Sequence, residues 1–143
     1  MKFMLPIFVL DLAHSKRTGI ARIWTATIFY RRGDVVLVAY PNSDLRTNKL
    51  RPALVVQADN LHTGLQQVII AMITSNLLRL GHPSRVAISI HSPEGELAGL
   101  ISDSVIVTDN LATVRETEIS HCLGTWTDMA LVDAALVHTL DLR

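Results

Sequence analysis

Two groups of polar residues at the ends of apolar runs are the part of this sequence whose residue types could do chemistry. Arg51 opens an apolar run after a polar loop, and Thr74, Ser75 and Asn76 close the next run. An arginine stays charged and holds phosphate oxygens with a planar fork of donors, while hydroxyl and amide groups hydrogen-bond to the same oxygens. Each group alone has an ordinary structural explanation, because arginines bind loop carbonyls and hydroxyls cap turns. Together, at the ends of neighbouring strands, they favour a phosphate-handling site.

The sequence lacks the common catalytic and nucleotide-binding motifs. It contains no G-x-x-x-x-G-K-[ST], no G-x-G-x-x-G after a strand, no H-E-x-x-H and no G-x-S-x-G. No two of the six histidines form a helical i,i+4 pair with a carboxylate partner, and the single cysteine, Cys122, excludes an internal disulfide and a multi-cysteine zinc site. We therefore expect neither a metal ion nor a cofactor.

Composition indicates one soluble domain. The chain has 143 residues, 49% of them apolar and 18% charged, which suits a packed core and argues against disorder. Its 13 basic and 13 acidic residues cancel. A nucleic-acid ligand would therefore have to meet a local basic patch. A cytoplasmic location and no membrane association are expected.

Residues 1–28 differ from the rest and are predicted to be an N-terminal extension to a domain spanning 29–143. The apolar run 3–10 resembles the core of a signal peptide, but Asp11 and His14 interrupt it and no small-residue cleavage pattern follows. The run is also too short to cross a bilayer. Either a loosely packed arm or translated sequence upstream of the natural start fits these residues.

The elements that must position the polar groups are mostly β-strands. Continuous or alternating apolar runs, broken by turn clusters, predict strands at 34–40, 51–57, 67–74, 85–91, 104–108 and 119–125. A short helical turn is predicted within 58–64, and the residues 92–95 are predicted to interrupt the strands. Helical spacing of Met129, Val132, Leu136 and Leu140 predicts a closing helix with Thr127 as its N-cap. Short strands with one closing helix favour a small, partly open β-barrel of the SH3-like kind.

The order of motifs also carries a family resemblance. R-G-D-V-V-L-V, K-x-R-P-A-L-V-V, I-T-S-N, D-S-V-I-V-T-D-N-L-A-T-V and G-T-W resemble the MazF/PemK (Kid-like) toxins over about residues 30–141. R-P-A followed by I-T-S is the specific part. The resemblance implies a mainly β, SH3-like barrel with short helices and a C-terminal helix, a homodimer, and metal-independent cleavage of single-stranded mRNA at a short sequence. It also implies a small cognate antitoxin whose C-terminal tail occupies the substrate groove, and it leaves open binding of operator DNA by the toxin–antitoxin complex.

Carried over residue by residue, the resemblance assigns catalysis to Arg51, Thr74 and Asp109. The chain departs from the family pattern at Val107, where some members have a second arginine, and at two neighbouring positions, Asn110 and Ala112. An arginine–aspartate pair across positions 107 and 109 is therefore unavailable, and Asp109 has a structural alternative in fixing the following turn. The simpler arrangement of an arginine and a threonine remains intact.

The mechanism implied by the resemblance uses the 2′-hydroxyl of the RNA as nucleophile and leaves a 2′,3′-cyclic phosphate and a 5′-hydroxyl. Arg51 would stabilise the charge on the scissile phosphate, and Thr74 with Ser75 would donate hydrogen bonds to its oxygens. Arginine is a poor general base because its pKa lies above ~12. The motifs therefore do not identify the group that accepts the proton of the 2′-hydroxyl.

The polar loop 41–50 is the predicted lid over the RNA. It is longer than a usual hairpin loop, although a solvated mobile loop has the same composition. Tyr40 and Trp126 are the candidates for base stacking, Trp126 with the stronger alternative of a core position. The predicted RNA-binding residues are Asn42, Arg46, Asn48, Lys49, Ser75 and Asn76. Two other functional hypotheses stay open. One is a toxin-fold module that binds an antitoxin or nucleic acid without cleavage, and the other is an unrelated β-barrel interaction domain.

Overall fold

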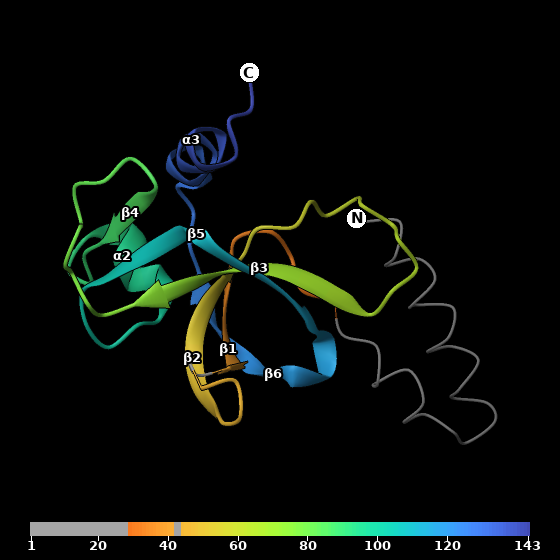
Figure 1. Ribbon diagram of the computed structural model, residues 1–143. Coiled ribbons are helices and arrows are strands. Elements are labelled where there is room, and N and C mark those ends of the chain that lie inside the picture. The colour runs from red at the N-terminus through yellow and green to blue at the C-terminus, as the bar shows by residue number, and fades with distance from the viewer. Residues whose placement is uncertain (1–28, 42–43) are drawn as a thin grey trace, which may run out of the picture.

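The computed structural model describes residues 29–41 and 44–143. The predicted extension 1–28 and Asn42 lie outside these residues. In the described part the strands form one antiparallel sheet with the order β4-β5-β3-β2-β1-β6 (Figure 1). The strands are β1 (Asp34–Pro41), β2 (Asn48–Val55), β3 (Gln67–Thr74), β4 (Arg85–Ile88), β5 (Ser104–Arg115) and β6 (Ile119–Thr125). The predicted mainly β fold with short helices is confirmed.

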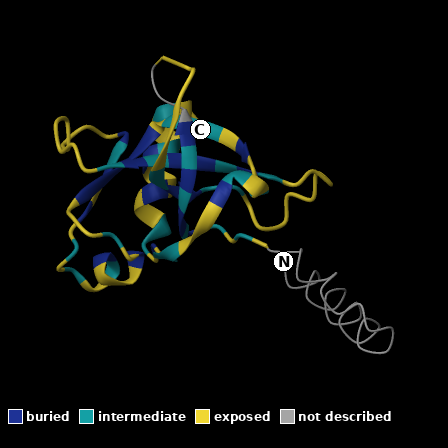
Figure 2. Cartoon of the chain, turned by 90° about the horizontal axis from the view of Figure 1, so that it is seen from below, coloured by how far each residue is buried: buried dark blue, intermediate teal, exposed yellow. Residues whose placement is uncertain are grey.

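The sheet is curled so that both of its faces bury apolar side chains. On β1, Val35 and Val36 point to opposite faces and both are fully buried. This explains the continuous apolar run in the sequence, because a strand covered on both sides does not alternate. One cluster contains Val35, Leu54, Ile73, Ile106 and Trp126, and the other contains Val36, Val38, Tyr40, Ala53 and Ile70. Figure 2 shows the buried residues along the strands and the exposed ones in the connecting loops.

Two α-helices cover parts of the sheet. Helix α2 (Pro93–Ala98) packs against β6, and α3 (Met129–Leu140) packs against β5 and β4. The predicted interruption of the strands at 92–95 is confirmed, but it contains a helix that was not predicted: Ser92 caps α2 by accepting a hydrogen bond from the Gly95 amide at 3.0 Å. Helix α3 begins after Asp128 instead of Thr127, and the helical turn predicted within 58–64 is absent from the described structure. None of the described helices is long and apolar enough to cross a membrane.

Strand β5 differs most from its prediction. It continues to Arg115, whereas the strand was predicted to end at Thr108, before the polar residues Asp109 and Asn110. On β3, Ala71 pairs with Leu111 but its neighbour Met72 pairs with Val107, so residues 108–110 bulge out of the ladder. The bulge lets the strand absorb its polar residues and continue. Strand β4 is shorter than predicted and ends at Ile88.

Candidate phosphate-binding site

Arg51 and Thr74 lie on neighbouring strands at the same end of the sheet. Arg51 is on β2, opposite Val38 of β1, and Thr74 is the last residue of β3. The β2–β3 ladder ends at the pair Ala53–Met72, two residues from Arg51 on β2 and two residues from Thr74 on β3. Residues two apart on a strand share a face, so both side chains lie on the side of the sheet that carries Ala53 and Met72.

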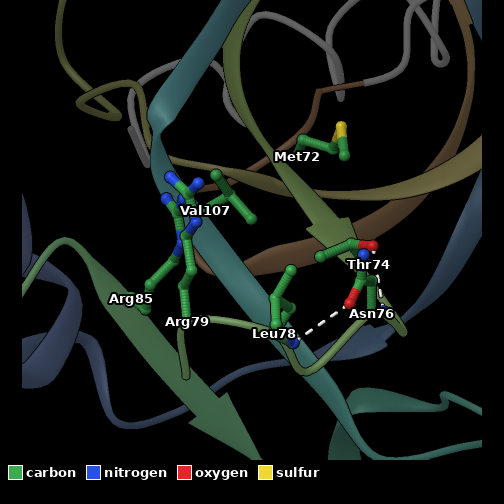
Figure 3. A pocket seen from close by; sticks show the side chains of 7 residues that line it. All are labelled: Met72, Thr74, Asn76, Leu78, Arg79, Arg85 and Val107. Atoms are coloured by element: carbon green, nitrogen blue, oxygen red, sulfur yellow. Dashed lines mark hydrogen bonds between the residues drawn. The ribbon is translucent and has the colours of Figure 1, made fainter. Parts of the chain in front are cut away.

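Thr74 lines a surface hollow of about 360 Å³ that Arg51 does not reach (Figure 3). The hollow lies over the ends of β3, β4 and β5 and over the loop that follows β3. In Figure 3 two arginine side chains lie along one side, with the threonine and an asparagine on the other. The lining residues are Met72, Thr74, Asn76, Leu78, Arg79, Arg85 and Val107.

Hydrogen bonds hold the loop after β3 around the threonine hydroxyl. The Asn76 amide donates to Thr74 Oγ1 at 3.1 Å, and the Leu78 amide donates to Asn76 Oδ1 at 3.0 Å. Because the hydroxyl oxygen accepts, its proton can donate to a ligand in the hollow. Ser75 is exposed and does not line the hollow, so of the three polar residues that close β3 the hollow brings together Thr74 and Asn76.

Arg85 is a charged residue of the hollow that the sequence analysis missed. It opens β4, lies opposite Val107 on β5, and forms an ion pair with Asp109 of the bulge. Its side chain is 16% exposed, against 49% for Asp109. One signal could have found it: like Arg51, it stands where a polar turn enters an apolar strand.

The bulge is anchored by its two other residues. Thr108 is buried, and its hydroxyl lies 2.7 Å from the Ser84 carbonyl oxygen and 2.8 Å from the Thr139 hydroxyl. Asn110 Oδ1 accepts a hydrogen bond from the Tyr40 hydroxyl at 2.7 Å. These contacts fix the bulge against α3, β1 and the turn before β4, which sets the position of Asp109.

The two aromatic residues considered for base stacking are both in the interior. Tyr40 is 6% exposed and Trp126 is 3% exposed. Burial raises the pKa of Tyr40, so its hydroxyl stays protonated and donates to Asn110. Neither ring presents a face to a ligand, and the stacking prediction for Tyr40 is wrong.

The predicted lid is shorter than expected, because Asn48 and Lys49 belong to β2, opposite Pro41 and Tyr40. Asp44 accepts hydrogen bonds from the Arg46 and Thr47 amides at 2.9 and 3.1 Å. These bonds hold the pKa of Asp44 below its usual value. The Arg46 side chain is exposed in this turn, and Lys49 lies on the same face of β2 as Arg51, two residues along.

Histidines near the hollow are held by other side chains. His82 Nδ1 lies 2.8 Å from Ser84 Oγ, and its ring meets that of His138 edge-on with centroids 6.0 Å apart. Among residues 29–41 and 44–143, no three histidine, cysteine or acidic side chains are grouped so as to hold a metal ion.

Comparison with known proteins gives one family match. Residues 31–140 match the family model described as "PemK-like, MazF-like toxin of type II toxin-antitoxin system". No protein of curated function matches the chain in sequence.

Solved structures share the fold at low sequence identity. An endoribonuclease in complex with its cognate antitoxin, from mycobacterial species, has a TM-score of 0.62 at 22% identity, covering 80% of this chain and 98% of that one. The Mycobacterium tuberculosis toxin MazF-mt6 has a TM-score of 0.61 at 20% identity, with coverages of 77% and 98%. MazE-MazF from Deinococcus radiodurans has a TM-score of 0.62 at 18% identity, with coverages of 81% and 100%.

Proposed function

The chain belongs to the PemK-like, MazF-like toxins of type II toxin–antitoxin systems, and on this premise we propose that it is an endoribonuclease cleaving single-stranded mRNA at a short sequence. The observation that supports the proposal most is the position of Thr74. Thr74 lines an open hollow together with Arg85, and Arg51 lies on the neighbouring strand β2. Arginines around one hydroxyl suit a phosphate that gains negative charge during reaction.

The charge distribution fits an RNA ligand. The whole chain has no net charge, yet the described residues place Arg51, Lys49, Arg79 and Arg85 around one end of the sheet. Local positive charge of this kind binds a phosphate backbone. The hollow has the volume of a small-molecule site, which suits one nucleotide of a single strand.

The proposed reaction is an internal transesterification. The 2′-oxygen of the RNA bonds to the adjacent phosphorus and loses its proton to a solvent base, while the bond from phosphorus to the 5′-oxygen breaks. That oxygen takes up a proton, so the products are a 2′,3′-cyclic phosphate and a 5′-hydroxyl. Arg51 neutralises charge on the phosphoryl oxygens, and Thr74 donates a hydrogen bond to one of them. Since the nucleophile belongs to the substrate, the reaction is proposed to proceed without a metal ion.

A cognate antitoxin is the proposed protein partner, since two of the similar structures are named as toxin–antitoxin complexes. Leu78 supports this, because it lines the hollow and is 74% exposed. An apolar residue so placed can pack against a protein chain that also covers the arginines. A homodimer, operator-DNA binding by the complex and a cytoplasmic location belong to the same proposal. A monomeric mass by light scattering at micromolar concentration would count against the dimer.

Incubating the purified full chain with a long single-stranded RNA in EDTA tests the proposal. We expect cleavage that is lost in Arg51→Ala and in Thr74→Ala. Arg32→Ala and Thr113→Ala are matched controls, because neither residue lines the hollow, and both variants should cleave normally. RNA binding without cleavage would instead identify a non-catalytic toxin-fold module. Neither binding nor cleavage would contradict both RNA functions.

A further inference from the structure

We infer that Arg85 is a second phosphate-binding arginine of this site, delivered from β4 to the place where position 107 has valine. The inference rests on the proposed RNA cleavage and adds a residue to it. With valine at position 107, Arg51 alone would stabilise the transition state. Arg85 supplies a second arginine.

The position of Arg85 follows from the strand register. Val107 pairs with Met72 on one side and with Arg85 on the other, so these three residues form a row across β3, β5 and β4. Members of such a row share a face, and neighbouring Cβ atoms lie ~5 Å apart. All three line the hollow, and in Figure 3 the overlapping side chains of Arg79 and Arg85 extend toward Val107. The long arginine side chain can therefore bring its charge to the space above Val107.

The hydrogen bonds of Arg85 orient its guanidinium for a ligand. Its ion pair with Asp109 and its 3.4 Å contact with Ser84 Oγ both use Nη1. Among the described residues, no group pairs with the Nε–Nη2 edge. This edge is one of the two-donor forks that bind carboxylate or phosphate in bidentate fashion. Asp109 thus acts as a positioning residue for Arg85, in addition to its place in the bulge.

The other arginine of the hollow is held differently. Arg79 lies in the exposed loop after β3, at a positive φ of 76°, and no described side chain pairs with its guanidinium. An exposed charge that no protein group holds attracts RNA but does not preorganise a transition state. Arg85, largely buried and held by a carboxylate, is the preorganised member of the two.

A purely structural role is the rival explanation, in which the ion pair only fastens β4 to the bulge. Three variants of the full chain separate the two roles: Arg85→Ala, Arg85→Lys, and the exchange Arg85→Val with Val107→Arg. Arg32→Ala is the matched control, because Arg32 is also a partly buried arginine paired with an aspartate across elements. For each, kcat and KM for single-stranded RNA in EDTA are measured beside thermal melting.

We expect Arg85→Ala to lower kcat by about 10²-fold with little change in KM, the range for losing one preorganised donor. Arg85→Lys should recover part of this loss, and the exchange should recover most of it, because it returns an arginine to the hollow from β5. Arg32→Ala should keep the wild-type kcat. This pattern, at unchanged melting temperature for Arg85→Lys, supports the inference.

Two results would overturn it. Wild-type kcat in Arg85→Ala would remove Arg85 from the site while leaving the proposed function of the chain intact. Loss of kcat that follows loss of melting temperature in every Arg85 variant, with no recovery in the exchange, would assign a structural role. Absence of cleavage by the wild-type chain would contradict the proposed function itself and the inference with it.

Discussion

Two arginine–aspartate ion pairs of this molecule have different surroundings. Arg32, before β1, pairs with Asp133 of α3 at 2.5 Å, and its Nε donates to the Val56 carbonyl at 3.0 Å. Arg85, at the start of β4, pairs with Asp109 and borders the hollow that contains Thr74. In the first pair the guanidinium contacts protein groups on two of its nitrogens. In the second, both contacts converge on one nitrogen.

The difference shows what separates a structural arginine from a candidate functional one. Burial is similar, since the Arg32 and Arg85 side chains are 26% and 16% exposed. Partner type is the same. What differs is the neighbourhood: Arg32 joins helix α3 to the end of β2, while Arg85 lines a hollow that also contains the Thr74 hydroxyl. The proposed role of Arg85 therefore rests on guanidinium nitrogens that pair with no group of the described residues.

The largest expected effect is at the proposed phosphate site. Arg51→Ala should lower kcat for single-stranded RNA by roughly 10²–10³-fold, because it removes charge from the phosphate in the transition state. Steady-state cleavage of a fluorescent oligonucleotide measures it. Equal losses of kcat in Arg51→Ala and in Arg32→Ala would contradict the different roles given to these two arginines.

At the other ion pair, Arg32→Ala should lower the free energy of unfolding by about 1 kcal/mol, since it removes a partly exposed ion pair and a hydrogen bond to a carbonyl. Urea denaturation followed by circular dichroism measures it. Asp133→Asn is the matched variant and should lose less, because it keeps an acceptor for Arg32. A fall in kcat without a fall in stability would contradict the structural assignment.

A smaller effect is expected from Lys49, which shares a face of β2 with Arg51 but has an exposed side chain. If it contacts one phosphate, Lys49→Ala should reduce the slope of log K against log salt by about 1, without lowering kcat. Filter binding to an uncleavable oligonucleotide between low and moderate salt measures the slope. Arg143→Ala, at the end of the chain, should leave the slope unchanged.

The smallest expected effect is the acid response of the turn before β2. Hydrogen bonds from Arg46 and Thr47 lower the pKa of Asp44, so its carboxylate supports the turn above the ordinary aspartate pKa. This support is lost as pH falls through the lowered pKa. Amide exchange or NMR shifts of Arg46 and Thr47 should therefore change only in the acid range. Asp44→Ala should abolish that step, and a step near neutral pH would contradict its cause.

Much of the fold was predictable because apolar runs mark buried strands. Strand β3 at 67–74 and β6 at 119–125 match their predicted ranges. The bulge of β5 was not predictable, because polar residues in an apolar run normally end a strand. Contacts from Ser84 and Tyr40, which are distant in sequence, hold these polar residues within β5. Helix α2 was missed because a Ser-Pro pair signals both a turn and a helix start.

The site was predictable where it is local in sequence. Arg51 and Thr74 lie on β2 and β3, which are consecutive along the chain, so an antiparallel pairing of these two strands could be expected to place them at the same end of the sheet. Arg85 reaches the same place through β5, which lies between β3 and β4 in the sheet but follows both in the chain. Only the sheet order brings Arg85 beside Val107, and no local pattern contains that order.

The central claim, cleavage of RNA by its own 2′-hydroxyl at the Arg51–Thr74 site, is tested most directly by the ends of the products. Mass spectrometry of an RNA oligonucleotide cleaved by the wild-type chain in EDTA should find a 2′,3′-cyclic phosphate on one fragment and a 5′-hydroxyl on the other. Replacing the 2′-hydroxyl at the cleaved position with hydrogen should abolish the reaction. Fragments with a 5′-phosphate, or cleavage of the deoxy-substituted strand, would contradict the account.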